Sequence, residues 1–184
     1  SFVGTSNGIL FFMAYTKKVA KKGLKATGYW LMKSEPHEYS FEDLEKSKNG
    51  GRWDGVRNYQ ARNFLRDMKI GDKVLFYYSS IKMPLIVGTA LIKGAPYPDP
   101  TQFDKKSPYY DPKATKERFI WVSRDLVPVD NFLSAKEGRG VTLSELRTNK
   151  KLSALRLLAP GNRLSVMPVS KAHYEEVLRM AKGK

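Results

Sequence analysis

The irregular order of strand-like and helix-like segments constrains the fold of this chain more than any other feature. Strand patterns are predicted near residues 29–32, over 73–79, in the apolar run 85–92, over 118–129 and over 163–169. Two helices follow the first strand, whereas the later strands follow one another with little helix between them. A doubly wound parallel sheet requires regular alternation, so this order favours an α+β fold: a small, curved or barrel-like mixed sheet flanked by short helices.

The predicted helices begin at side chains that can accept a free backbone N–H. These N-caps are Ser40, Asn58, Thr142 and Ser170. After Asn58, apolar side chains recur at i, i+3, i+4 and i+7, which predicts an amphipathic helix that ends before Gly71.

The segment from Trp53 to Asn63 holds the densest mixture of candidate binding groups. It combines a large aromatic ring, a carboxylate, a glycine, two arginines and several carboxamides. Aromatic faces stack unpaired bases, and Asp, Asn and Arg contact base edges or phosphates. The polar neighbours of Trp53 would be costly to bury, which argues against a purely interior position. We therefore predict a base-binding pocket here, with a core position for Trp53 as the alternative.

The candidate site also draws on the ends of two predicted strands. The candidate base-binding residues are Trp53, Asp54, Val56, Asn58, Ser34, Tyr77, Ser79 and Trp30, and the candidate phosphate-binding residues are Arg57, Lys33 and Arg62.

Several of these residues have a structural interpretation as well. Asn58 suits a plain N-cap, Trp30 a core position, and Arg57 an ion pair with a neighbouring carboxylate. Tyr77 shares a strand face with Ser79, opposite to Tyr78, and which of the two faces lines the pocket stays open.

The charge balance points to a polyanionic partner. The formal net charge is +15, and residues 1–27 contribute five lysines and no acid, so the remainder is basic by itself. Such a balance favours nucleic acid over an anionic membrane, with a merely solubilising surface as the alternative. Cysteine is absent and the two histidines lie far apart in the chain, so we expect no metal site and no cofactor.

The composition divides the chain near Gly28. We predict a basic, disordered tail over 1–27 and one folded domain over 28–184, acting as a monomer. Residues 1–12 are uncharged and precede Met13; they are either additions before a natural start or a short targeting segment. No apolar run reaches the length of a membrane span.

Catalysis is disfavoured because no nucleophile has a suitable base. Ser34, near Glu35 and Asp54, is the best candidate, and no histidine is placed to serve it. We predict a non-catalytic protein that recognises a modified or flipped base. The alternatives are a general RNA-binding or scaffold protein without base preference, and a nucleotide-processing hydrolase.

Several motifs in fixed order resemble the EVE domain family over about residues 28–182. They are Tyr29–Pro36, Trp53–Asn63, Gly71-Asp72, Phe76–Ser79, Tyr97–Thr101, Tyr109–Lys113 and Arg163–Val166. One departure is Tyr78, where the family commonly has histidine.

The resemblance implies a PUA-like pseudo-barrel, related to the domains that read N6-methyladenosine in RNA. It implies recognition of a modified nucleobase, with a modified cytosine in DNA as one candidate, rather than chemistry. It also implies a nuclear location.

Overall fold

The computed structural model describes residues 28–134 and 139–183. The predictions made for the tail over 1–27 lie outside these residues. The strands are β1 (Tyr29–Ser34), β2 (Gly51–Trp53), β3 (Lys73–Tyr78), β4 (Leu85–Ile92), β5 (Tyr97–Pro98), β6 (Val122–Asn131), β7 (Val141–Thr142) and β8 (Val166–Pro168). The helices are α2 (Phe41–Lys46), α3 (Tyr59–Asp67), α4 (Leu143–Thr148) and α5 (Lys171–Ala181), with short 3₁₀ turns at Pro100–Phe103, Lys150–Leu152 and Arg156–Leu158.

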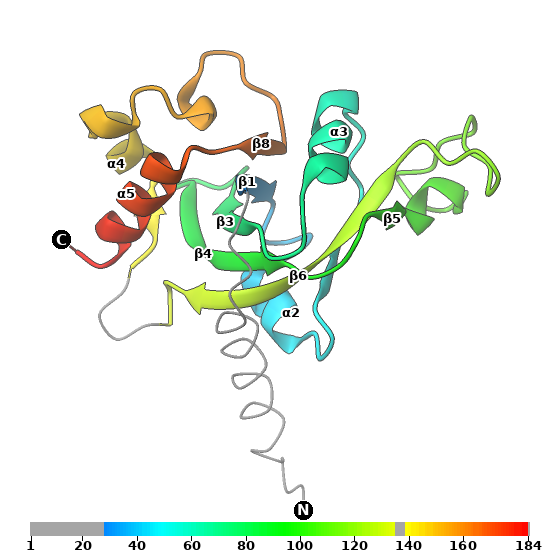
Figure 1. The fold of residues 1–184 in the computed structure, drawn as a ribbon, viewed down its shortest axis with the longest axis horizontal. Coiled ribbons are helices and arrows are strands. Elements are labelled where there is room, and N and C mark those ends of the chain that lie inside the picture. The colour runs from blue at the N-terminus through cyan, green and yellow to red at the C-terminus, as the bar shows by residue number, and fades with distance from the viewer. Residues whose placement is uncertain (1–27, 135–138, 184) are drawn as a thin grey trace, which may run out of the picture.

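The strands form a curled mixed sheet in the order β2-β6-β4-β3-β1-β8 (Figure 1). β5 pairs with β6, and β7 pairs with β4. Register shifts between Phe76 and Tyr77 and between Thr89 and Ala90 interrupt the two central ladders. Such bulges bend a strand and increase its twist, which accounts for the strong curl.

Among the strands of residues 28–134 and 139–183, only β1 and β3 run parallel to each other, with Ser34 opposite Tyr78 at their ends. Both strands therefore finish at the same edge of the sheet, and the segments that follow them begin side by side. In Figure 1, α3 lies on one side of these strands and α4 and α5 on the other, while the segment after β5 extends away from the sheet.

The four predicted N-caps are confirmed. Ser40, Asn58, Thr142 and Ser170 each accept the backbone N–H three residues further on. Capping of this kind satisfies one of the N–H groups that a helix leaves free at its first turn. Helix α3 buries Ala61 and Leu65 against the sheet, as the periodicity predicted.

The structure departs from the predicted elements at several places, which include the two-residue strands β5 and β7. β2 was not predicted, because three residues beginning with a glycine carry too little periodicity to read. β6 begins at Val122 rather than at residue 118, so Trp121 precedes it, and β8 is shorter than the predicted 163–169. The residues just before β6, Ile120 and Trp121, are held instead by the buried side chain of Gln102. Its Oε1 accepts both of their N–H groups at 2.9 Å.

The prediction of an α+β fold on a curved mixed sheet is confirmed. None of the helices within 28–134 and 139–183 has both the length and the apolar character that crossing a membrane would require.

Candidate functional site

A cavity of about 480 Å³ opens where β1 and β3 end. Its volume falls within the roughly 300–1,000 Å³ usual for small-molecule sites. It is lined by Lys33, Ser34, Glu35, Glu38, Tyr39, Arg52, Trp53, Asp54, Gly55, Val56, Ser79, Ser80, Tyr109, Arg163 and Ser165. These residues come from five separate stretches of sequence, which the curl of the sheet brings together.

Trp53 forms part of the cavity wall and part of the core. Its side chain is largely buried, and its ring meets Phe76 edge-on at 5.3 Å between centroids and Tyr39 at 6.2 Å. These perpendicular contacts fix the plane of the indole. The two interpretations of Trp53 from the sequence, cavity wall and core, therefore both apply.

Charged groups in the cavity are partly removed from water. Burial, followed by repulsion from Asp99, raises the pKa of Asp54 above its ordinary value. Arg52 is the nearest cation, with 3.9 Å between its Nη1 and Asp54 Oδ2. Burial likewise lowers the pKa of Lys33, and no carboxylate in the described part of the chain forms an ion pair with it. The cavity thus offers a carboxylate, Asp54, whose ion pair is long, and a cation, Lys33, that has no ion pair among the described residues.

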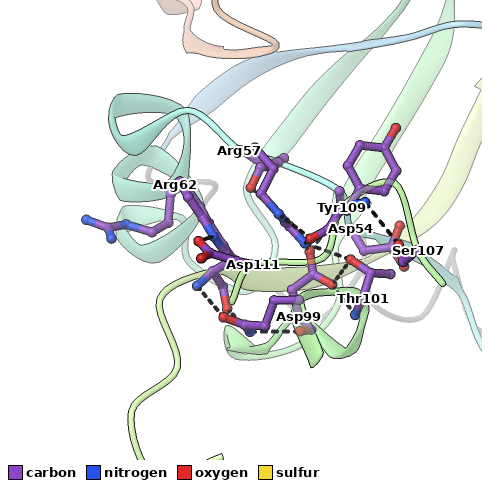
Figure 2. Close-up of polar contacts among 12 residues, drawn as sticks. Asp54, Arg57, Arg62, Asp99, Thr101, Ser107, Tyr109 and Asp111 are labelled. Atoms are coloured by element: carbon purple, nitrogen blue, oxygen red, sulfur yellow. Dashed lines mark hydrogen bonds and ion pairs between the residues drawn. The ribbon is translucent and has the colours of Figure 1, made fainter. Parts of the chain in front are cut away.

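A buried carboxylate, Asp99, organises the wall behind Asp54 (Figure 2). Its Oδ1 accepts the N–H and hydroxyl of Thr101 at 2.8 and 2.6 Å. Its Oδ2 accepts the Gly55 N–H at 2.9 Å and Arg57 Nη1 at 2.8 Å. Burial opposes ionisation of Asp99, but hydrogen bonds from Arg57, Thr101 and Gly55 outweigh it and lower the pKa. We call Asp99, Arg57, Gly55, Thr101 and Tyr109 the Asp99 cluster.

The Asp99 cluster fixes Tyr109 as a cavity wall. Arg57 donates from Nε and Nη2 to the Tyr109 carbonyl, and its guanidinium carbon lies 5.5 Å from the centre of the Tyr109 ring. The Tyr109 ring rests on Gly55, where a Cβ would approach the ring carbons to 2.9 Å. Gly55 has φ +72°, a conformation that glycine adopts without steric cost. The Tyr109 hydroxyl then donates to Glu38 at 3.1 Å, which joins two loops at the rim.

A model of the EVE domain matches residues 28–180. The chain belongs to the EVE domain family. It is 38% identical to thymocyte nuclear protein 1 of Mus musculus over 171 residues, which cover 86% of this chain and 75% of that protein.

Solved structures of similar sequence share this EVE fold. A protein from Pseudomonas putida is 46% identical, with a TM-score of 0.77, covering 83% of this chain and 99% of that one. The human THYN1 protein, in complex with DNA containing 5-methylcytosine, is 36% identical, with a TM-score of 0.77, covering 86% of this chain and 99% of that one. These similarities confirm the PUA-like fold class, a curled half-barrel with a few helices.

Six of the eleven predicted site residues line the cavity of this EVE domain: Lys33, Ser34, Trp53, Asp54, Val56 and Ser79. The two serines are engaged with the backbone. Ser34 Oγ donates to the Tyr39 carbonyl at 2.7 Å, and Ser79 Oγ donates to the Ser34 carbonyl at 3.3 Å. They join the strand ends and leave hydroxyl lone pairs as acceptors.

Two predicted base-binding aromatics lie away from the cavity. Trp30 is in the core, where its Nε1 donates to Asp72 at 2.8 Å and its ring packs against Phe64. Tyr77 is buried, which raises its pKa against a smaller opposing effect of Arg147. Neither Tyr77 nor Tyr78 lines the cavity, although Ser79 does, and the Tyr78 hydroxyl accepts the Phe41 N–H at 2.7 Å. Trp30 follows its core interpretation.

The remaining predicted polar residues differ in how much they can offer a ligand. Asn58 is exposed and accepts the Ala61 N–H at 3.0 Å, as an N-cap does. Arg57 uses all five of its N–H donors on Val56, Asp99, Thr101 and Tyr109, so none remains for a phosphate. The structure therefore replaces its predicted phosphate contact with a role in holding the cavity wall.

The rim holds a serine, a carboxylate and a histidine in an order that does not suit a nucleophile. Ser80 Oγ donates to Glu35 Oε1 at 2.7 Å, and His37 Nε2 lies 3.3 Å from Glu35 Oε2. The carboxylate stands between the other two, whereas nucleophile activation requires the imidazole against the hydroxyl. Glu35, His37 and Glu38 also place ligand atoms within 4.8 Å of one another, but their carboxylates already accept hydrogen bonds, and no metal site is proposed.

Sequence reasoning missed Tyr109, Arg52 and Arg163 as cavity residues. Tyr109 stands in one of the motifs that carry the family resemblance, and Asp99 stands in another. The motifs could therefore have pointed to both residues, but the prolines around them were equally consistent with a purely structural loop. Arg163 also begins one of these motifs, Arg163–Val166, but its approach to the cavity, like that of Arg52, depends on the curl of the sheet.

Proposed function

We propose that this protein binds nucleic acid and holds one modified base, a modified cytosine being the leading candidate, in the cavity at the ends of β1 and β3. The observation that carries the proposal is the pairing of a fixed indole wall, Trp53, with a carboxylate, Asp54, whose ion pair with Arg52 is long at 3.9 Å, inside a cavity of about 480 Å³. The human relative in complex with 5-methylcytosine DNA supports the choice of base.

Each proposed contact follows from the chemistry of the base. Trp53 lies against the flat ring, since stacking on an aromatic side chain contributes roughly 1–3 kcal/mol per base. Asp54 accepts from the exocyclic amino group, which is the donor that cytosine presents. Val56 offers apolar surface to a substituent on the ring, and the hydroxyls of Ser34 and Ser79 complete the polar edge.

Positive charge around the cavity suits the phosphates on either side of the inserted base. Lys33 and Arg163 line the cavity, and neither forms a hydrogen bond or ion pair through its side chain with other described residues. The five lysines within residues 1–27 add a further, sequence-independent attraction. Removal of residues 1–27 should lower overall affinity and flatten its salt dependence while base preference stays unchanged.

The site is proposed to bind without catalysis, because its hydroxyls donate to carbonyls or to a carboxylate rather than to a neutral base. A nuclear location and a monomeric state complete the proposal; the names of the curated relatives support the location.

The second candidate is a general nucleic-acid binder without base preference. The net charge of +15 favours it, because phosphate contacts alone give strong binding that falls with salt. The two candidates differ in one measurable property, the ratio of affinities for modified and plain oligonucleotides.

The test is a fluorescence titration against matched oligonucleotides at two salt concentrations. They carry cytosine, 5-methylcytosine, 5-hydroxymethylcytosine, adenine or N6-methyladenine, as DNA and as RNA. We expect at least a tenfold preference, about 1.4 kcal/mol, for one modified base. The preference should disappear in Trp53→Ala, while most of the salt-sensitive binding persists.

Trp30→Phe is a suitable control, because it alters a tryptophan that lies outside the cavity. It should retain the preference once folding has been verified. Equal affinities for all oligonucleotides, falling together with salt, would leave the general binder as the function.

A further inference from the structure

The outer face of α3 carries an exposed aromatic ring followed by two arginines, three and seven residues further on. Tyr59, Arg62 and Arg66 share this face, opposite to the buried Ala61 and Leu65. The Tyr59 side chain is 58% exposed, although it belongs to a well-packed helix. We call Tyr59, Arg62 and Arg66 the α3 platform.

The α3 platform is held rigidly from below. The Tyr59 ring packs on Trp121 at 4.9 Å between centroids and an angle of 35°. The Ile120 carbonyl lies 3.4 Å from Arg62 Nη1 and 3.3 Å from Arg66 Nη2, so the two cations share one acceptor. A carboxylate would be the usual partner for such a pair, but no ion pair within the described residues involves either arginine.

Arg62 retains donors that Arg57 lacks. Asn63 Oδ1 accepts from its Nε and Nη2 at 3.2 and 2.8 Å, and Ile120 accepts from Nη1, which leaves two N–H groups without a partner. Figure 2 shows the Arg62 side chain pointing away from the Asp99 cluster. Its guanidinium carbon lies 4.8 Å from the centre of the Tyr59 ring, so ring and charge are presented together.

A continuous series of stacked groups connects the α3 platform to the cavity. From the cavity wall, the Arg57 guanidinium carbon lies 5.5 Å from the Tyr109 ring and 5.3 Å from the Trp121 ring, on which Tyr59 rests. A strand whose base occupies the cavity therefore has this surface within reach of its neighbouring nucleotides.

We propose that the α3 platform binds an unpaired nucleotide next to the base held in the cavity, with that neighbouring base against Tyr59 and its phosphate at Arg62 and Arg66. The inference rests on the proposed function for the identity of the strand. An exposed aromatic ring beside uncommitted guanidinium groups matches the chemistry of single-stranded nucleic acid, which presents flat bases and phosphates in alternation. The contact is tolerant of sequence, because every base has a face that can stack.

The test combines a change in the protein with a change in the strand. The probe is a single-stranded 9-mer DNA with a central 5-methylcytosine, made either intact or with abasic positions on both sides of that base. For the wild-type protein we expect the abasic strand to bind about tenfold more weakly, the loss typical of one stacked base. In Tyr59→Ala this difference should vanish, because the stacking surface is already gone.

Charge is tested separately with Arg62→Gln and a matched control. Arg62→Gln should weaken binding of the intact strand and reduce the slope of log affinity against log salt by about one. Lys171→Gln removes one exposed charge from α5, which lies across β1 and β3 from α3 in Figure 1. This control should leave both the affinity for the intact strand and the salt slope unchanged. A thermal melt of each variant verifies that the fold is retained.

The outcomes separate this inference from the proposed function. Equal abasic penalties in wild type and Tyr59→Ala, or no penalty in wild type, would overturn the α3 platform. A penalty that Tyr59→Ala removes, in a protein that binds cytosine and 5-methylcytosine equally, would support the platform and overturn the proposed base preference.

Discussion

Replacing Asp99 by asparagine tests whether the Asp99 cluster holds the cavity wall. The side chain of Asp99 is fully buried and accepts four hydrogen bonds, two at each oxygen. Asparagine offers one oxygen and one NH₂ group, so two donors would face another donor in either orientation. Each unsatisfied buried group costs about 1–3 kcal/mol, and Arg57 would also lose its ion pair. We expect Asp99→Asn to destabilise the domain by about 3 kcal/mol.

Thermal unfolding provides the measurement. For a domain of this size, about 3 kcal/mol corresponds to a decrease in Tm of roughly 6–12 °C. Asp67→Asn is the matched control, because Asp67 is exposed at the end of α3 and surface substitutions usually change stability by less than about 0.5 kcal/mol. A decrease no larger than that of the control would refute the assigned role of Asp99.

The pH dependence gives an independent check on the same variant. The pKa of Asp99 is lowered in the folded state, so its stabilising contribution is present above the unfolded pKa near 4 and is lost as the pH falls through the folded value. The difference in Tm between wild type and Asp99→Asn should therefore be largest near pH 7 and should narrow below about pH 4. A difference that stays constant across this range would contradict the electrostatic part of the reasoning.

Three further substitutions test neighbouring features. Gly55→Ala places a methyl group 2.9 Å from the Tyr109 ring, at a φ of +72° that disfavours alanine. The free energy of unfolding measured in urea should fall by at least about 1–2 kcal/mol. Unchanged stability would mean that Tyr109 does not rest on this backbone. Burial raises the pKa of Asp54. The ionised carboxylate therefore destabilises the folded state near pH 7, and this cost is removed as the pH falls and the group is protonated. Asp54→Asn should accordingly raise the free energy of unfolding at pH 7, by less than about 1 kcal/mol because the side chain is partly solvated, and Tm should rise slightly. The gain should disappear below about pH 4, and a loss of stability at pH 7 would contradict this. Ser40→Ala removes the hydroxyl that accepts the Asp43 N–H, whereas the backbone N–H of residue 40 can still donate to Asp43. It should cost about 0.5–2 kcal/mol by chemical denaturation, and a neutral result would show that α2 does not need this side-chain cap.

Local features of this protein followed from the sequence because they depend on neighbouring residues. The caps at Ser40 and Asn58, and the helix whose apolar positions include Ala61 and Leu65, are set within a turn or two of chain. The strand over 85–92 was readable for the same reason, since a continuous apolar run records burial on both faces. The motif order carried the family resemblance.

Only the tertiary structure decided what each candidate site residue does. Arg57 and Arg62 were both predicted to bind phosphate, yet Arg57 uses all its donors on Val56 and the Asp99 cluster, whereas Arg62 presents free donors at the surface. Trp30 and Trp53 were both candidate base-binding residues from the sequence, but β1 directs one ring to Asp72 and the curl of the sheet brings the other to the cavity. The physical reason is that these roles depend on partners more than forty residues away, such as Asp99 and Tyr109, whose positions local propensity does not encode.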